Sequence, residues 1–405
     1  MTIFLKDTDN TYSYEDLLDR VNSSFVYYPL LKSNNLYDYW SNLVISLVSN
    51  KPLVLLDADL KCSELDDINI LQVNEAVEIK KSFFSSISEL ISALCLSKSE
   101  ITIFTSGTTG QPKKIIHTIT SLTRSVRRAE CYSGQIWGFA YNPTHMAGLQ
   151  VFFQAFENQN ALVNIFNCTR GEIYASIKAN GITHVSATPT YYRLLLPVEE
   201  ICPNVQRITL GGEKSEQRLY NSLMKIFPSA KINNIYASTE AGSLLAAKGE
   251  NFQIPVALAD KFRVEEDELL IHKSLLGKSK DFCYFGDYYC TGDLIEWVNQ
   301  EEGIFRFKSR KNELINVGGY KINPEEVEEV IQQMTGVLQA FVYGKKNSVL
   351  GNILCAEVKL APGIELSELD VRQFLRSVLQ NFKIPRLIKF VGEFSLTRTG
   401  KLKRI

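Results

Sequence analysis

Short apolar runs alternate with longer segments of helical period along most of this chain, and this alternation limits the folds open to it. Turn residues bound the apolar runs, as expected of buried strands. Repeated strand–helix alternation predicts an α/β fold with largely parallel, buried sheets. The strand candidates are 52–56, 101–104, 136–140, 161–166, 184–187, 207–210 and 231–236, and helices are predicted over 219–226 and from about 118 to 130.

The pattern changes after residue 310 and indicates a second, smaller domain. Pro324 and the acidic residues after it suit the first turn of a helix. We therefore expect a large N-terminal domain of layered β-sheets with flanking helices (1–311), followed by a small mobile α+β lid domain (312–405). The small domain should contain strands at 340–343 and 353–360 and a helix at 366–380.

Composition excludes several classes of protein. The net charge of -1 gives no field that would gather nucleic acid or an anionic membrane surface. The N-terminus lacks the apolar core of a signal peptide, and no apolar run is long enough to span a bilayer. Eight cysteines without a Cys-x-x-Cys pair and only four histidines argue against a metal site of those residues. We expect a cytoplasmic protein with reduced thiols.

A loop rich in glycine and hydroxyl residues follows the strand at 101–104 and should precede a helix. Glycine lets the backbone approach an anion, hydroxyls add donors and lysine adds charge, so the loop suits a triphosphate. It lacks the Walker order, and an ordinary polar turn is the alternative. The candidate phosphate-binding residues are Thr105, Ser106, Gly107, Thr108, Thr109, Gly110 and Lys113.

The loop resembles the signature loop of the superfamily of acyl-CoA synthetases, nonribosomal-peptide adenylation domains and luciferases. In that superfamily it binds the β- and γ-phosphates of ATP. Lys114 stands where the family usually has glycine, and it either aids phosphate binding or points to solvent. The sequence motifs of this chain are most similar to those of small aryl- and acyl-CoA ligases.

Further segments match the family in order. The run from Tyr236 to Glu240 resembles Tyr-Gly-x-Thr-Glu, which implies that Tyr236 stacks on adenine, Thr239 contacts the α-phosphate and Glu240 holds Mg²⁺. Ala237 replaces the family's glycine. The resemblance also implies an adenine-side turn and a ribose-binding aspartate, here Gly211, Gly212, Glu213 and Asp293.

The C-terminal motifs complete the resemblance. Arg310 would contact the ribose or phosphate, and Asn312 occupies the hinge position. The C-terminal Thr-x-x-Gly-Lys motif ends at Lys401, which would bridge the carboxylate and the α-phosphate as charge develops. Ser309 replaces a family glycine. The face expected to admit a pantetheine thiol consists of Gly318, Gly319 and Tyr320.

The segment 142–149 resembles the Pro-x-x-His-x-x-Gly-Leu of acyl- and aryl-CoA ligases, in which the histidine, here His145, lies near the substrate carboxylate. A satisfied core histidine is the alternative. The segment lacks the aspartate that pairs with an α-amino group in amino-acid-activating members. The mixed size of the pocket candidates favours a small aryl or short acyl acid, with o-succinylbenzoate one possibility. These candidates are His145, Met146, Gln150, Ser186, Tyr191, Gly211 and Ser243.

The resemblance implies a two-step ligase with ATP and Mg²⁺ as cofactors. A small carboxylic acid would become acyl-AMP with release of pyrophosphate and then pass to the thiol of CoA or of a carrier-protein phosphopantetheine. One alternative is a stand-alone amino-acid-activating enzyme. Another is a non-catalytic nucleotide-binding scaffold, to which the replaced glycines and short length point, whereas the retained Lys401 argues against it.

Overall fold

The computed structural model describes residues 2–8, 10–57, 72–105, 113–215, 217–317, 320–347 and 351–394. The chain divides into two compact units. The large unit comprises Met1–Arg263, Leu270–Cys290 and Asn299–Ile304, and the small unit comprises Val264–Leu269, Thr291–Val298 and Phe305–Ile405. The division expected at Asn312 and the mobility of the small domain remain predictions.

The main sheet of the large unit has a parallel centre, as the alternation of strands and helices predicted. Strands β1, β10, β9, β11, β12 and β13 lie side by side in parallel, and β2 and β14 pair antiparallel at the two ends of this run. The strands are β1 (Ile3–Asp7), β2 (Asn10–Ser13), β9 (Ile136–Phe139), β10 (Ala161–Asn164), β11 (His184–Ala187), β12 (Arg207–Gly211), β13 (Lys231–Ser238), β14 (Gly242–Lys248) and β15 (Asn251–Gln253).

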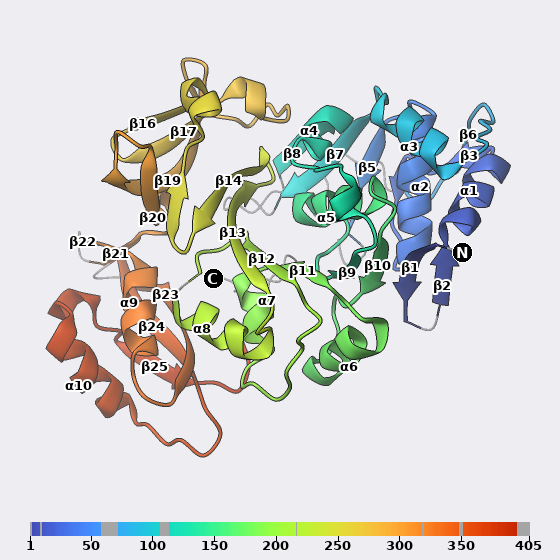
Figure 1. The fold of residues 1–405 in the computed structure, drawn as a ribbon. Coiled ribbons are helices and arrows are strands. Elements are labelled where there is room, and N and C mark those ends of the chain that lie inside the picture. Colours follow the sequence, from blue (N-terminus) through green and yellow to red (C-terminus); the bar gives the residue numbers. More distant parts are fainter. Residues whose placement is uncertain are drawn as a thin grey trace. The chain divides into compact units, whose positions relative to one another are not determined.

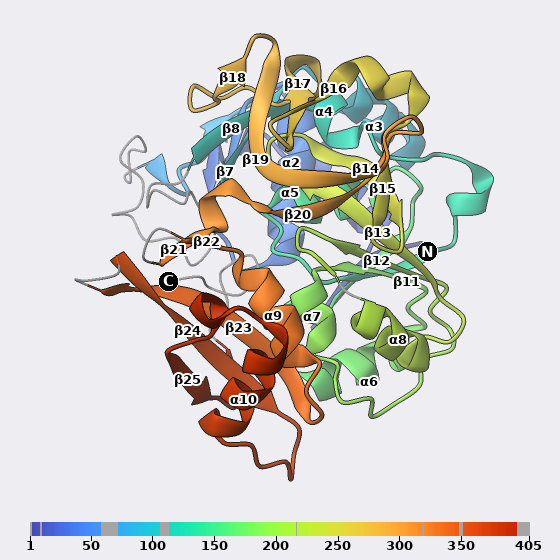
Figure 2. The same ribbon diagram turned by 90° about the vertical axis from the view of Figure 1, so that its left-hand side faces the viewer.

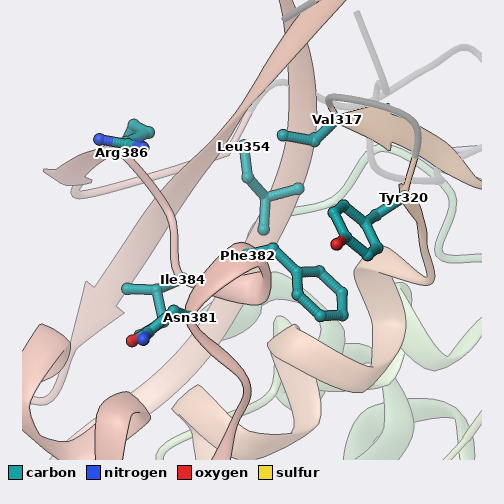
Figure 3. A pocket seen from close by; sticks show the side chains of 7 residues that line it. All are labelled: Val317, Tyr320, Leu354, Asn381, Phe382, Ile384 and Arg386. Carbon is teal, nitrogen blue, oxygen red and sulfur yellow. The ribbon is translucent and has the colours of Figure 1, made fainter.

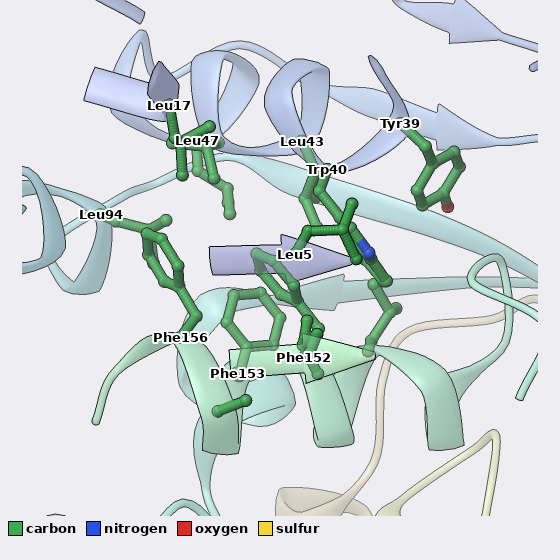
Figure 4. Close-up of a cluster of buried hydrophobic side chains, with 14 of the residues drawn as sticks. Leu5, Leu17, Tyr39, Trp40, Leu43, Leu47, Leu94, Phe152, Phe153 and Phe156 are labelled. Atoms are coloured by element: carbon green, nitrogen blue, oxygen red, sulfur yellow. The ribbon is translucent and has the colours of Figure 1, made fainter. Parts of the chain in front are cut away.

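Helices cover both faces of this sheet (Figure 1). Alternation along a strand sends neighbouring side chains to opposite faces, so Leu162 joins one apolar cluster and Val163 the other. The first cluster is rich in aromatic rings, with Trp40 stacked on Phe152 at a centroid distance of 4.2 Å (Figure 4). The helices are α1 (Tyr14–Ser23), α2 (Leu36–Val48), α3 (Ile87–Cys95), α4 (Ile119–Thr123) and α5 (Met146–Phe156) beside the first cluster, and α6 (Arg170–Asn180), α7 (Pro189–Arg193) and α8 (Gln217–Ile226) beside the second.

A second sheet of the large unit carries the two strands that flank the glycine-rich loop. Its order is β4 (Leu30–Leu31), β5 (Leu53–Leu55), β7 (Glu100–Thr105) and β8 (Lys113–Thr118). Strands β7 and β8 are antiparallel, and Thr105 pairs with Lys113. The helix expected after the loop does begin near residue 118, but the prediction missed the strand β8 that comes before it. The β-branched residues after the loop favour a strand, which returns along β7.

The helix expected from about 118 to 130 is also shorter than predicted. It is α4, which ends at Thr123. Arg124 keeps helical dihedrals and donates to the Leu275 carbonyl at 2.9 Å, and farther along Arg128 Nε donates to Glu157 at 2.5 Å. A 3₁₀ turn follows at Glu130–Tyr132.

The small unit is an α+β unit, as the sequence predicted for the C-terminal region. Strands β23, β24 and β25 form one sheet, and residues from α9 and α10 join alternate sheet residues such as Val342 and Leu354 in one core cluster (Figure 2). The two helices therefore pack on the same face. The bounds are β21 (Ile315–Val317), β22 (Tyr320–Ile322), α9 (Pro324–Gln332), β23 (Val337–Asn347), β24 (Gly351–Leu360), α10 (Glu368–Val378) and β25 (Leu387–Phe390).

The remaining elements are short or lie where the chain passes between the two units. None of the helices in the described ranges is long and apolar enough to cross a membrane. The remaining strands are β3 (Val26–Tyr27), β6 (Val77–Glu78), β16 (Phe262–Glu265), β17 (Glu268–His272), β18 (Tyr284–Phe285), β19 (Tyr288–Asn299) and β20 (Ile304–Arg310), and 3₁₀ turns lie at Val256–Lys261, Lys273–Leu275, Lys311–Glu313 and Asn381–Lys383.

Candidate active site

The turn 239–241 joins β13 to β14 in the large unit. Hydrogen bonds to its backbone carbonyl oxygens hold it in place. In chain order its three carbonyl oxygens accept hydrogen bonds from His117 Nε2 at 2.8 Å, from the Gly277 N–H at 2.8 Å and from Arg124 Nη1 at 3.4 Å. The donors come from β8, from the second residue after the 3₁₀ turn Lys273–Leu275 and from the residue that follows α4. The turn is thereby attached to the strand that leaves the glycine-rich loop.

The side chains of this turn include the predicted metal and α-phosphate ligands. Thr239, Glu240 and the preceding Tyr236 are all half-buried, so each keeps part of its surface accessible. Magnesium is usually held in proteins by one or two carboxylates together with substrate phosphates. The half-buried Glu240 supplies one carboxylate of the kind that this pattern requires.

The two lysines after the glycine-rich loop differ in orientation. Along β8 the buried residues alternate, with Ile115 and His117 inside and Lys114 exposed on the other side. Lys113, which is half-buried, belongs to the inner set. The cation that replaces the family glycine therefore points to solvent, and the family lysine lies on the side of the turn 239–241.

The Gly-Gly-Glu turn follows β12. Gly212 adopts the left-handed conformation with φ of 81°, which glycine tolerates best. A methyl group at Gly211 would lie 2.9 Å from the Ile235 side chain, so the strands β12 and β13 approach closely there. Glu213 Oε2 accepts from the Thr190 N–H at 3.0 Å and from the Thr190 hydroxyl at 2.7 Å. That oxygen binds the first turn of α7.

His145 stands immediately before α5 and has an acidic neighbour that sequence reasoning missed. Its Nε2 is buried without a hydrogen-bond partner among the residues that the structure describes and lies 3.9 Å from Asp57 Oδ2. Asp57 in turn accepts from Asn142 Nδ2 at 2.8 Å. Asp57 directly follows the predicted strand at 52–56, and only the tertiary structure brings it to the histidine.

Three of the predicted pocket residues lie together in the large unit. Gln150 accepts from the Ser243 hydroxyl at 3.0 Å and donates to Ser125 at 3.2 Å. A methyl group at Gly242 would lie 2.7 Å from Gln150 Nε2 and 3.7 Å from Met146 Sδ. Met146, Gln150 and Ser243 therefore surround one tight position at the start of β14.

Two other predicted pocket residues have partners within the protein. Ser186 is buried in β11 and hydrogen-bonds to Tyr141, whose pKa is raised by burial. Tyr191 belongs to the second apolar cluster and donates to the Ile165 carbonyl at 2.8 Å. The placement of Tyr191 favours a packing role, because its hydroxyl is already bound.

The small unit brings together Asp293, the predicted ribose ligand, and Arg310, which was predicted to contact the ribose or phosphate. Arg310 Nε donates to Asp293 Oδ1 at 2.7 Å. The buried Glu268 binds the residues next to this pair in sequence. It accepts hydrogen bonds from the Gly292 N–H and from Lys311 Nζ, both at 2.7 Å. Sequence reasoning missed Glu268 and Lys311, since the two are 43 positions apart.

A hollow of about 190 Å³ lies in the small unit beside the predicted thiol face (Figure 3). The Tyr320 ring stacks on Phe382 with centroids 4.4 Å apart and planes 15° apart. Apolar side chains form most of the remaining lining of the hollow, and the Arg386 guanidinium lies at its edge. The lining residues are Val317, Tyr320, Leu354, Asn381, Phe382, Ile384 and Arg386.

Several predicted residues lie outside the part of the chain that the structure describes, and their roles stay predictions. Of the others, the backbone of Thr105 lies in β7 and that of Asn312 in the 3₁₀ turn Lys311–Glu313. The residues outside the described ranges are Ser106, Gly107, Thr108, Thr109, Gly110, Gly318, Gly319 and Lys401.

Comparison with family models and with curated proteins gives a consistent result. A model described as AMP-binding enzyme matches residues 73–261, and one described as AMP-binding enzyme C-terminal domain matches 326–401. The 4-hydroxybutyrate–CoA ligase 1 of Metallosphaera sedula is 25% identical over 75% of this chain and 61% of its own length. The 2-succinylbenzoate–CoA ligase of Staphylococcus aureus is 25% identical over 75% of this chain and 65% of its own.

The fold is also found among solved structures. The o-succinylbenzoate CoA synthetase of Bacillus subtilis, solved with its acyl-adenylate intermediate, superposes with a TM-score of 0.72 over 99% of this chain and 94% of that one, at 19% identity. This likeness confirms the predicted fold class. The chain spans about three-fifths of the length of the first of these curated relatives.

Proposed function

Because the chain belongs to the AMP-binding family of adenylate-forming enzymes, we propose that it activates a small carboxylic acid with MgATP and transfers the acyl group to a thiol. The first step forms a bond between a carboxylate oxygen and the α-phosphorus and breaks the bond to the leaving pyrophosphate. The second step gives a thioester and AMP.

One observation carries the proposal. The His117–Thr239 hydrogen bond joins two motifs that are 122 positions apart in sequence. One is the strand that follows the candidate phosphate loop, and the other is the turn with the candidate α-phosphate and metal ligands. A triphosphate needs cation, hydroxyl and carboxylate groups from separate segments at one place, and this contact supplies that proximity.

The protein's own groups act by positioning and by charge. Lys113 would neutralise phosphate charge, the Thr239 hydroxyl would donate to the α-phosphate, and Lys401 would bridge carboxylate and phosphate during attack. A magnesium ion held by Glu240 and the phosphates would stabilise the leaving pyrophosphate. No side chain needs to act as a nucleophile, because the substrate carboxylate is one.

The acid is proposed to be a small aryl or short acyl carboxylate. Met146 is buried and Gln150 is hydrogen-bonded at both ends of its amide, so these predicted pocket residues are packed closely beside Gly242. The curated relatives named above act on 4-hydroxybutyrate and 2-succinylbenzoate according to their names, which are acids of this class.

The thiol acceptor is proposed to be CoA, with a carrier-protein phosphopantetheine as the other candidate. Both present the same reactive arm. The hollow beside Tyr320 supports an acceptor of either kind, because its apolar side chains could pack on a narrow pantetheine arm and Arg386 could pair with a phosphate of the acceptor. Turnover with free CoA, measured against turnover with a pantetheinylated carrier, separates the two.

Carboxylate-dependent ATP–pyrophosphate exchange tests the first step. Wild type and Lys401→Ala are compared across aryl, short acyl and amino acids, with Lys403→Ala as a matched control two positions along the same tail. We expect exchange with one class of small acid, at least about a hundredfold lower in Lys401→Ala and near wild type in the control. Exchange confined to amino acids would favour the amino-acid-activating alternative. No exchange with any acid, despite ATP binding, would favour the scaffold.

A further inference from the structure

Strand β8 contains a buried histidine that the proposed reaction does not use. The His117 side chain is 1% exposed. Its Nε2 lies 2.8 Å from the Thr239 carbonyl oxygen and its Nδ1 lies 3.0 Å from the Ser121 hydroxyl. A carbonyl can only accept, so Nε2 carries the hydrogen and donates it.

This ring is neutral under ordinary conditions. Burial, with a smaller effect from the Arg124 charge, lowers the pKa of His117 to about 4, against the raising effect of its bond to Thr239. A neutral imidazole stabilises charge poorly, but it can make a fixed hydrogen bond without carrying a charge. The geometry therefore indicates a structural link to the turn.

The surroundings leave space for this ring and no more. A methyl group at Gly277 would lie 2.6 Å from His117 Cε1 and 2.9 Å from Nδ1, far inside van der Waals contact. The same Gly277 donates its N–H to the Glu240 carbonyl at 2.8 Å. One glycine thus admits the imidazole and secures the neighbouring peptide.

We propose that His117 is a positioning residue for MgATP: it holds the peptide between Thr239 and Glu240 against the strand that leaves the phosphate loop. The inference rests on the proposed function, since it concerns the ligands assigned there. Removing the donor would leave the carbonyl of the half-buried Thr239 without this hydrogen bond and let the turn relax. The Thr239 hydroxyl and the Glu240 carboxylate would then lose their alignment.

Arg124 is the second side chain that acts on the turn, from α4. It donates to the Leu275 carbonyl at 2.9 Å and to the Ala241 carbonyl at 3.4 Å. The shorter distance and near-complete burial make His117 the stronger link to the turn itself. The role of His117 is therefore testable with Arg124 left in place.

The test uses three variants of the full chain. His117→Phe keeps a ring of similar size and removes the donor. His117→Gln restores an N–H at similar reach. His184→Phe is the matched control, because His184 is also buried, at 6% exposure, and its 2.9 Å contact with Thr183 and its packing on Trp137 lie away from the turn. Calorimetric titration measures binding of ATP with Mg²⁺ and of ATP with EDTA.

We expect His117→Phe to weaken MgATP binding about tenfold, which corresponds to about 1.4 kcal/mol, and to weaken ATP binding in EDTA much less. His117→Gln should recover most of the loss, and His184→Phe should bind MgATP like wild type. In exchange assays the KM for MgATP should rise in His117→Phe while the KM for the acid stays within about twofold.

The inference is overturned if His117→Phe binds MgATP like wild type, or if the loss is equal in EDTA and equal in His184→Phe. Equal losses would mean general destabilisation. Should His117→Phe fail to fold, His117→Gln and Gly277→Ala, which displaces the ring, decide the matter by the same titration. A wild type that binds MgATP and exchanges with no acid would refute the proposed reaction and leave the binding result for His117 standing.

Discussion

Acid should destabilise this protein through its buried histidines, and His184 allows the effect to be calculated. The ring is buried in β11 and packs against Trp137 at a centroid distance of 4.9 Å. Burial, and then the charge of Arg207, lowers the pKa of His184 to about 4. In the unfolded chain the pKa returns to about 6.5.

The sign follows from proton counting. Between pH 6.5 and about pH 4 the unfolded state binds a proton that the folded state does not, so the free energy of unfolding falls as the pH falls. The contribution of His184 to the free energy of unfolding is fully present above the unfolded-state pKa and is lost below the folded-state pKa. Linkage with these two values gives a loss of about 2 kcal/mol between pH 7 and pH 5.

Urea unfolding of wild type and His184→Phe at pH 7, 6 and 5 measures this quantity. The phenylalanine keeps the ring against Trp137 and removes the titrating nitrogen. We expect the wild type to lose about 2 kcal/mol more than the variant over this range, since all other titrating groups are shared. Parallel losses in the two proteins would refute the assigned burial effect.

Three further outcomes follow from particular contacts. Lys113→Ala should lower ATP–pyrophosphate exchange at least about tenfold, whereas Lys114→Ala should stay within about twofold because that side chain points to solvent; equal effects would contradict the assignment of the two faces of β8. Arg128→Ala should destabilise the fold by about 2 kcal/mol in urea, since it leaves the fully buried Glu157 carboxylate unpaired. Adding Glu157→Gln should recover part of that loss. His145→Ala should raise the KM for the acid about tenfold and the KM for ATP much less, as separate titrations of the two substrates would show.

Local pattern accounts for most of the secondary structure. The strand predicted at 184–187 is β11, and the helix expected at Pro324 begins there, because apolar period and helix-start chemistry are properties of neighbouring residues. The pattern failed at β8 and at the end of α4. The pairing of β8 with β7 gives the first its strand conformation, and beyond the second Arg124 and Arg128 bind residues far along the chain.

The candidate site divides in the same way. Motifs such as the run from Tyr236 to Glu240 are read from the sequence, because each is a short run of residue types suited to one chemical group. Asp57, His117 and Glu268 carry no such local signal. Each was found only from a contact with a residue far along the chain.

The sequence by itself therefore determined the class of fold, the family and the types of residue available for the chemistry. The tertiary structure alone decided that Lys113 and Lys114 lie on opposite sides of one strand and that a buried histidine supports the turn 239–241. The physical reason is the range of the interactions. Periodicity and turn chemistry act over a few residues, whereas the partner of a buried polar group is set by which distant segments the packed core brings together.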